Sequence, residues 1–527
     1  MTGVLAAAPS GTIGAPSIEY DQLAPMLVVF GAAVAGVLVE AFAPRSSRRA
    51  VHLVLTLGSL LAAFILTIVV ASTSRLFAGG SPGHVAAAGA VAVDRPTLFI
   101  QGTIVILALV SVLLIGDTSN SPFAAVAAAT PGSQEEREGL AAGIMHTEIF
   151  PLTLFAVGGM MLFPASNDLL TMFVALEVLS LPLYLLCGLA RRRRLLSHEA
   201  AVKYFLLGAF SSALFLFGIA MLYGFSGSVR LSAIASAATA NTSNATLLFT
   251  GIALTGVGLL FKIGAVPFHG WKPDVYQGAP TPITALMASC TVVSAFGALL
   301  RVFYVAFGRL IWDWRPAFWV VATLTMLVGA VVAITQTDVK RLLAYSSIAH
   351  AGFVLTAVIA TSVAGLSSSL FYLVSYGFTT VGAFAVITLV RDAGGEAGHL
   401  SRWAGLGRRS PLVAGIFALF LLAFAGIPLT SGFTGKFAVF QAAIAAGETP
   451  LVIVGVVSSA IAAFFYVRVI VLMFFSDPIP DGPEVVVPSV FTGTAVGLGV
   501  VATLVLGIVP QPLLSLANHA ANQLFVG

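Results

Sequence analysis

Residues 261–284 read FKIGAVPFHGWKPDVYQGAPTPIT and interrupt the apolar run 246–277. The run is longer than the roughly 20 residues that cross the hydrocarbon as a helix. Pro267 lies inside it, removes a backbone donor and clashes with the preceding turn. Lys262 stands five residues before this proline. The stretch therefore predicts a transmembrane helix that is broken near Lys262–Pro267 and carries a lysine at the break.

The composition of the rest of the chain is typical of a membrane protein. Hydrophobic residues make up 58% of the 527 residues and charged residues 9%, whereas a soluble domain carries about 25% charged residues. Apolar runs of about 20 residues recur along the sequence, and each is long enough to span a bilayer. About fourteen such runs predict an all-α polytopic membrane protein.

A second interrupted run, 411–446, repeats the pattern of the first. Ala425-Gly-Ile-Pro428 resembles Gly264-Ala-Val-Pro267 at an offset of 161 residues (264 to 425), and a Gly-rich stretch follows it up to Lys436. We expect this helix to be broken near Pro428–Gly435. The offset corresponds to five helices, and an odd number inverts one copy in the membrane. Inverted repeats with broken helices are typical of transporters, where the breaks mark the transport site.

This repeat divides the sequence into four parts. We predict helices 1–3 and a cytoplasmic loop in 1–145, a first inverted five-helix repeat in 146–308, a second in 309–476 and helix 14 in 477–527. Residues 116–147 are expected to form the cytoplasmic loop, with a short helix in it.

The basic residues predict the orientation, because cytoplasmic loops carry an excess of Lys and Arg. Loops after even-numbered helices hold fewer: Arg75, Arg95, Arg230, Arg309 and Arg315. Loops after odd-numbered helices hold Arg45, Arg48, Arg49, Arg137, Arg191 to Arg194, Lys272, Lys340, Arg341, Arg391, Arg402, Arg408 and Arg409. Both termini are therefore expected on the outer side.

Five ionisable side chains fall within the predicted helices: Glu177, Lys203, Lys262, His350 and Lys436. A charge at the bilayer centre costs roughly 2.5–3.5 kcal/mol, so such residues usually mark a pathway or a relay. Buried carboxylates, amines and imidazoles that exchange protons suit a proton relay.

Three of these residues also have a simpler interpretation. Glu177 could form a structural hydrogen bond between helices, and His350 could be held in place by one. Lys203 follows Glu199 by four residues near the cytoplasmic end, as in an interfacial ion pair.

Glu177 and Lys262 are expected to approach within about 7 Å, because a counter-charge offsets the cost of burying each ion. At that distance and an effective dielectric near 20, they would interact by about 2.4 kcal/mol. Separating the two charges would then favour release of a proton from the lysine.

These motifs together resemble a known family. The stretch 261–284 resembles the seventh-helix signature of the antiporter-like subunits of proton-pumping NADH:quinone oxidoreductase, respiratory complex I. Its part 274–282, DVYQGAPTP, is more similar to the subunit N branch, the counterpart of mitochondrial subunit 2, than to subunits L or M. Residues 340–350, KRLLAYSSIAH, and 425–436, AGIPLTSGFTGK, extend the resemblance, which covers roughly 145–475.

The resemblance implies a role for each candidate. Glu177 matches the glutamate of the fifth helix and Lys203 the lysine of the sixth. Lys262 matches the lysine of the broken seventh helix, and His350 a histidine of the tenth. Lys436 matches the lysine of the broken twelfth helix, where subunit M has a glutamate.

One departure concerns the eighth helix, where some members carry a lysine near Thr291 or Val292. Residues 281–300 hold no charged or imidazole side chain. A relay from Lys262 to His350 would then run through water, Ser289, Cys290 or Thr291, or follow a different path.

No metal or redox cofactor is expected, because the sequence has no strand-associated Gly-rich dinucleotide loop and no spaced cysteine set. The resemblance implies a proton-translocating subunit in the inner (plasma) membrane. Its partners would be other membrane-arm subunits, which handle NADH and quinone, and no nucleic acid is expected. A subunit of a multi-subunit Na⁺/H⁺ antiporter, a stand-alone solute transporter and a non-conducting spacer of the membrane arm are the alternatives.

Overall fold

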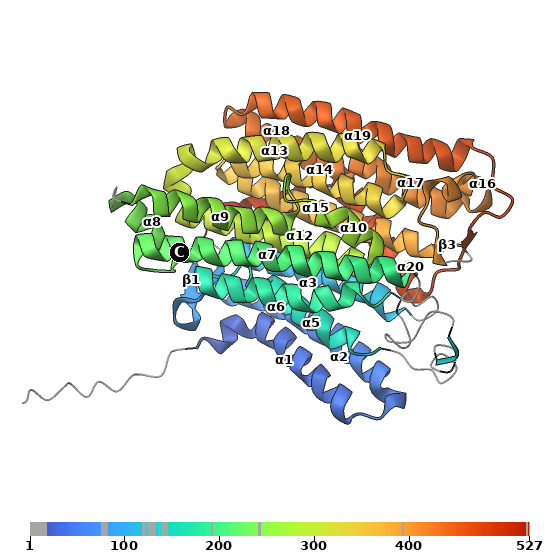
Figure 1. Ribbon diagram of the computed structural model, residues 1–527, viewed down its shortest axis with the longest axis horizontal. Helices are drawn as coiled ribbons and strands as arrows, with labels where there is room; N and C mark the ends of the chain where they lie inside the picture. Colours follow the sequence, from blue (N-terminus) through green and yellow to red (C-terminus); the bar gives the residue numbers. More distant parts are fainter. Residues whose placement is uncertain are drawn as a thin grey trace, which may run out of the picture.

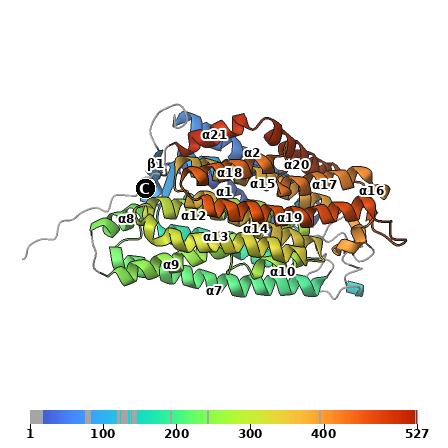
Figure 2. The same ribbon diagram turned by 90° about the horizontal axis from the view of Figure 1, so that it is seen from above.

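The computed structural model describes residues 18–74, 83–117, 123, 133–135, 138, 146–190, 193–240, 244–392, 395–522 and 525. The helices lie side by side with roughly parallel axes, as the two views in Figures 1 and 2 show. The helix predicted within 116–147 lies largely outside the described residues. So do four arginines used for the orientation: Arg75, Arg137, Arg191 and Arg192.

Fourteen spans can be traced through the described residues. Twelve helices are long and apolar enough to cross a membrane; the shorter α5 and the pair α17–α18 complete the set and confirm the expected number. The spans are built from α1 Tyr20–Phe42, α2 Arg45–Thr73, α3 Arg95–Gly116, α5 Ile149–Leu162, α6 Leu169–Cys187, α7 Arg194–Ser226, α9 Ala245–Ile263, α10 Trp271–Gly278, α11 Thr281–Leu286, α12 Val292–Arg301, α13 Ile311–Ile334, α14 Val339–Ile359, α15 Val363–Leu389, α17 Pro411–Ala425, α18 Ser431–Ala445, α19 Thr449–Phe475 and α20 Val490–Ile508.

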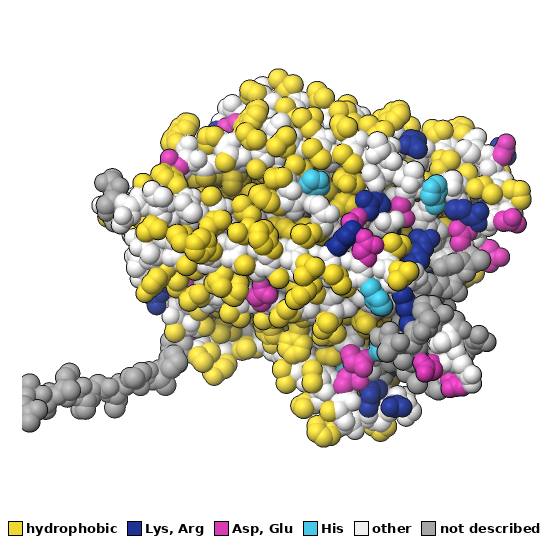
Figure 3. Space-filling view, in the orientation of Figure 1, with side chains coloured by type: hydrophobic (Ala, Val, Ile, Leu, Met, Phe, Trp, Pro, Cys, Tyr) yellow, Lys and Arg dark blue, Asp and Glu magenta, His cyan; other side chains and the backbone are white. Residues whose placement is uncertain are grey.

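Short elements connect the spans. A hairpin of β1 Gly83–Ala86 and β2 Val91–Asp94 precedes α3, and β3 Val390–Asp392 pairs with β4 Gly395–Glu396 and β5 Glu484–Val485. The other α-helices of the described residues are α8 Leu231–Ala240, α16 Leu406–Arg409 and α21 Gln511–Ala521. Hydrophobic side chains cover most of the face in Figure 3, while charged ones gather toward the end where α16 and β3 lie.

Both predicted helix breaks are present and begin in the same way. α9 is followed directly by Gly264 and α17 by Gly426, with φ of 80° and 85°. This left-handed conformation favours glycine. Gly264 donates to the carbonyls of Leu260 and Phe261, and Gly426 makes the corresponding pair of bonds one repeat later. The structure therefore aligns the breaks at these two glycines.

The second break is shorter than expected. Non-helical backbone ends at Thr430 and α18 begins at Ser431, so the prediction of a break reaching Gly435 was wrong. A Cβ on Gly432 would lie 1.9 Å from the carbonyl oxygen of Ala423. Glycine is required there by the close approach of two helices, and it does not interrupt α18.

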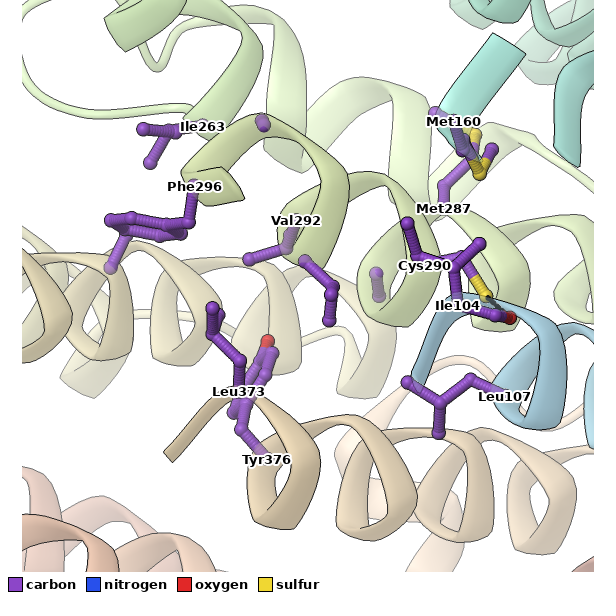
Figure 4. Packing of buried hydrophobic residues seen from close by; sticks show 14 of the residues in the cluster. Ile104, Leu107, Met160, Ile263, Met287, Cys290, Val292, Phe296, Leu373 and Tyr376 are labelled. Atoms are coloured by element: carbon purple, nitrogen blue, oxygen red, sulfur yellow. Dashed lines mark hydrogen bonds between the residues drawn. The ribbon is translucent and has the colours of Figure 1, made fainter. Parts of the chain in front are cut away.

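The eighth span, Thr281–Ala306, lies at the centre of the molecule. Its most apolar window is entirely buried, and the windows of α14 and α15 are 94% buried, against 28% for α20. Figure 4 shows Met287, Cys290, Val292 and Phe296 of this span packed among apolar side chains of neighbouring helices. The middle of the eighth span is thus a buried element without charged side chains.

Candidate functional site

Lys262 lies in the last turn of α9, where three helices converge. Its side chain is buried, and its ammonium donates to the hydroxyls of Ser180 on α6 (2.8 Å) and Tyr204 on α7 (2.9 Å). None of the ion pairs found among the described residues involves Lys262. The ammonium is therefore held by neutral hydroxyls that can accept or pass on a proton.

Glu177 lies on α6, three residues before Ser180, and is partly buried. Its Oε1 is buried and has no hydrogen-bond partner in the described part of the chain. The carboxylate is close enough to Lys262 to act on it electrostatically. The two groups thus interact through charge and not through a direct hydrogen bond.

Two consecutive side chains of α10 form hydrogen bonds with the end of α9. The indole of Trp271 donates to the carbonyl of Phe261 (3.0 Å) and stacks on Tyr204, with ring centroids 4.8 Å apart. The ammonium of Lys272 donates to the carbonyl of Ile263 (3.0 Å). Because the last carbonyls of a helix lack intrahelical partners, these donors stabilise the broken end.

Lys272 corrects one of the sequence predictions. We assigned it to a cytoplasmic loop, but its side chain is 0% exposed. The physical reason is that the chain re-enters a helix at Trp271, and α10 packs against α7 and α14. Its burial could have been suspected from the sequence, because Lys272 lies between the break and Pro280, within the stretch 261–284.

His350 lies in the buried interior of α14, at the start of a series of hydroxyl groups. Its Nδ1 is 2.6 Å from the phenol oxygen of Tyr372 on α15, and its Nε2 is 3.4 Å from that of Tyr466 on α19. Tyr466 is in turn hydrogen-bonded to Ser346. The sequence did not reveal these partners, which come from separate helices.

Lys436 lies in α18 and reaches back across the second break. Its ammonium donates to the carbonyls of Phe424 (2.9 Å) and Ala425 (3.0 Å) and to the hydroxyl of Ser459 (2.8 Å). It also lies over the ring of Phe353 at 4.8 Å. A second buried lysine is thus held by neutral oxygens at a helix break.

Lys203 stands apart from these residues. Its ammonium forms ion pairs with Glu199 (2.6 Å) and Asp274 (2.5 Å), and its side chain is 40% exposed. Asp274 also pairs with Arg341 of α14. The i, i+4 ion pair that we considered for Lys203 is present, and Asp274 joins α7, α10 and α14.

The burial of two further basic residues escaped the sequence interpretation. Arg301 at the end of α12 pairs with Asp94 at 2.8 Å, and both side chains are 0% exposed. Lys340, which we placed in a loop, is buried and donates to the carbonyl of Ala279 (2.9 Å) and the hydroxyl of Thr281 (3.1 Å). The second contact fixes the junction between α10 and α11.

The eighth span offers little to a relay through its own side chains. The hydroxyl of Ser289 donates to the carbonyl of Ala285 (2.7 Å), and Cys290 Sγ faces the carbonyl of Ile104 on α3 (3.6 Å). Thr291 Oγ1 is buried without a hydrogen-bond partner among the described residues. Among all the described residues, no group of three or more His, Cys, Asp or Glu could hold a metal ion.

Comparison with known proteins places this arrangement in a family. Residues 166–462 match the family described as NADH:quinone oxidoreductase/Mrp antiporter, TM. The chain is 64% identical to NADH-quinone oxidoreductase subunit N of Rhodococcus opacus (strain B4), over 98% of each chain. It is 63% identical to subunit N of Acidothermus cellulolyticus, again over 98% of each.

Solved structures agree with this placement. A chain of respiratory complex I from Thermus thermophilus with bound aureothin is 32% identical, with a TM-score of 0.73 over 93% of this chain and 98% of that one. A chain of the Mrp complex from Dietzia sp. DQ12-45-1b shares the fold, with 23% identity and a TM-score of 0.78 over 96% of this chain and 98% of that one. The chain therefore belongs to the NADH:quinone oxidoreductase/Mrp antiporter transmembrane family, in the branch formed by the N subunits of NADH-quinone oxidoreductase.

Proposed function

We propose that this chain is a proton-translocating subunit in the membrane arm of an NADH:quinone oxidoreductase. The observation that carries the proposal is the state of Lys262, a buried ammonium at a helix break whose partners are the hydroxyls of Ser180 and Tyr204. A buried charge is costly, and neutral partners leave the amine able to gain and lose a proton.

The relay that we propose runs through Glu177, Lys203, Lys262, His350 and Lys436. Glu177 acts on Lys262 through charge, so a change in their separation would change the proton affinity of the lysine. His350 and its tyrosine hydroxyls extend the polar path toward Lys436. Lys203 is the entry or exit group at the end of the path, because it is the exposed member of the set.

The remaining roles belong to the assembled complex. We propose that other membrane-arm subunits are the partners, and that they handle NADH and quinone while this chain carries no redox cofactor. We also propose the plasma membrane as the location, with both termini on the outer side. The relatives are N subunits of NADH-quinone oxidoreductase, which supports membership of that complex over the Na⁺/H⁺ antiporter alternative.

The test is Lys262→Ala in the assembled complex, reconstituted in vesicles. Proton translocation and quinone-linked NADH oxidation should both fall, because alanine cannot hold a proton. NADH oxidation by an artificial electron acceptor should stay unchanged, since this chain has no part in electron entry. Arg408→Ala is the control, because it removes a cation whose side chain is 58% exposed in a surface ion pair. An assembled Lys262→Ala complex with the wild-type proton-to-electron ratio would favour the spacer alternative.

A further inference from the structure

At each of the two helix breaks, the ammonium of a lysine lies close to the glycine that follows the first half-helix. A Cβ placed on Gly264 would lie 3.3 Å from the ammonium nitrogen of Lys272, and one on Gly426 would lie 3.3 Å from that of Lys436. Each lysine comes from the second half-helix and reaches back to the first. Lys272 is therefore the structural counterpart of Lys436, although the sequence motifs align Lys262 with the break.

The hydrogen bonds repeat the same relation. Lys272 donates to the carbonyl of Ile263, the residue before Gly264, at 3.0 Å. Lys436 donates to the carbonyl of Ala425, the residue before Gly426, also at 3.0 Å. In both halves an ammonium thus covers the carbonyl end of a helix, where the helix dipole favours a cation.

Among the described residues, Lys272 has no fixed counter-ion. Its side chain is fully buried, it lies 5.7 Å from the ring centroid of Tyr276, and no ion pair found in the described residues includes it. Two titratable groups of the described residues lie close enough to feel its charge: His269, in the break itself, and His350 on α14. His350 feels the charge of Lys436 as well. Lys272 thus lies within electrostatic reach of the central histidine from the first half, as Lys436 does from the second.

We propose that Lys272 is a proton-exchanging residue of the first half and bridges Lys262 and His350 in place of a charge on the eighth span. The proposal rests on the proposed function and extends its relay. It accounts for the lack of charged side chains in the middle of the eighth span (Figure 4), because the relay passes along α10 instead.

The transfer itself moves one proton and nothing else. An N–H bond of the Lys262 ammonium breaks as one forms on the neutral amine of Lys272, directly or across water. An N–H bond of Lys272 then breaks as the imidazole of His350 gains the proton. Lys262 and Lys272 end as neutral amines and His350 as an imidazolium, so charge and atoms balance.

The test separates proton exchange from the structural role of Lys272 as a cap. In Lys272→Gln the side chain keeps an N–H donor on the same side as the Ile263 carbonyl, one bond shorter than lysine, but holds no exchangeable charge. We expect the complex to assemble and its proton translocation to fall at least about a hundredfold, the low end for loss of a proton-transfer group. NADH oxidation by an artificial acceptor should be unchanged. Lys436→Gln is the matched variant in the second half and should behave alike.

The outcomes distinguish this inference from the proposed function. Wild-type translocation in Lys272→Gln, together with impaired Lys262→Ala, overturns only the role of Lys272. Wild-type translocation in both variants overturns the relay as a whole. If Lys272→Gln does not assemble, Lys272→Arg retains the cap and the charge but does not release a proton; translocation at the wild-type rate in that variant contradicts the inference. Partial recovery of proton translocation in the double variant Lys272→Gln, Thr291→Lys would support the inference, since the eighth span then carries a lysine.

Discussion

The phenol oxygen of Tyr204 lies 2.9 Å from the ammonium of Lys262, and the centroid of its ring lies 5.2 Å from the same nitrogen. The tyrosine therefore stabilises the ammonium in two ways, as a hydrogen-bond acceptor and as a ring beside a cation. It also stacks on Trp271, so the orientation of α10 and the state of Lys262 are physically connected.

Tyr204→Phe removes the hydroxyl while keeping the ring. A lost hydrogen bond to a charged group costs about 1.5–3 kcal/mol, which should favour the neutral amine of Lys262. We expect slower proton translocation than in the wild type, but a smaller loss than in Lys262→Ala. Tyr223→Phe is the control, since Tyr223 is an exposed tyrosine on the same helix. Equal rates in Tyr204→Phe and wild-type vesicles would contradict the prediction.

Lys436 faces two carbonyl oxygens, so the sign of the replacing charge should matter. Lys436→Gln keeps a donor toward these carbonyls, and we expect the complex to assemble while translocating protons poorly. Lys436→Glu places a carboxylate against the carbonyl end of α17, where the helix dipole disfavours an anion. Its assembly yield, measured by native gel, should be lower than that of Lys436→Gln. The reverse order would contradict this prediction.

The Asp94–Arg301 pair is predicted to stabilise the fold and to take no part in proton transfer. Removing one partner of a buried ion pair costs about 3–5 kcal/mol, because the other charge is left uncompensated. Arg301→Met should lower the thermal unfolding temperature of the purified complex. Combining it with Asp94→Asn should restore part of the loss, since no unpaired charge remains. An additive effect of the two changes would argue against a coupled pair.

Lys203 could hold α10 in place through Asp274 or exchange protons, and a comparison with Asp274 variants distinguishes the two roles. If Lys203 only holds α10 through Asp274, Lys203→Ala and Asp274→Ala should have the same small effect, and the double variant should be no worse. Partly exposed pairs of this kind contribute about 0–1 kcal/mol. If Lys203 exchanges protons, Lys203→Ala should slow translocation beyond Asp274→Ala. The proposed relay predicts the second outcome, measured as the proton translocation rate in vesicles.

Many features of the fold and part of the candidate site were predictable because they depend on local sequence. Pro267 and Pro428 lie inside long apolar runs, and each run is broken close to its proline because backbone geometry is a property of a few consecutive residues. The burial of Lys262, His350 and Lys436 also follows from their places in apolar runs. The extent of the second break did not follow, since Gly432 serves a contact between helices and not a turn.

The sequence by itself determined the class of protein, the number of spans, the two breaks and the residues that bring charge into the membrane. These properties depend on hydrophobic length and backbone chemistry along one segment. Only the tertiary structure decided that Lys272 is buried at the end of α9, that Tyr204 binds Lys262, and that Asp94 meets Arg301 across 207 residues. Such contacts depend on how each helix is rotated and placed against its neighbours. That arrangement is set by the packing of all the helices together and is not encoded in any one of them.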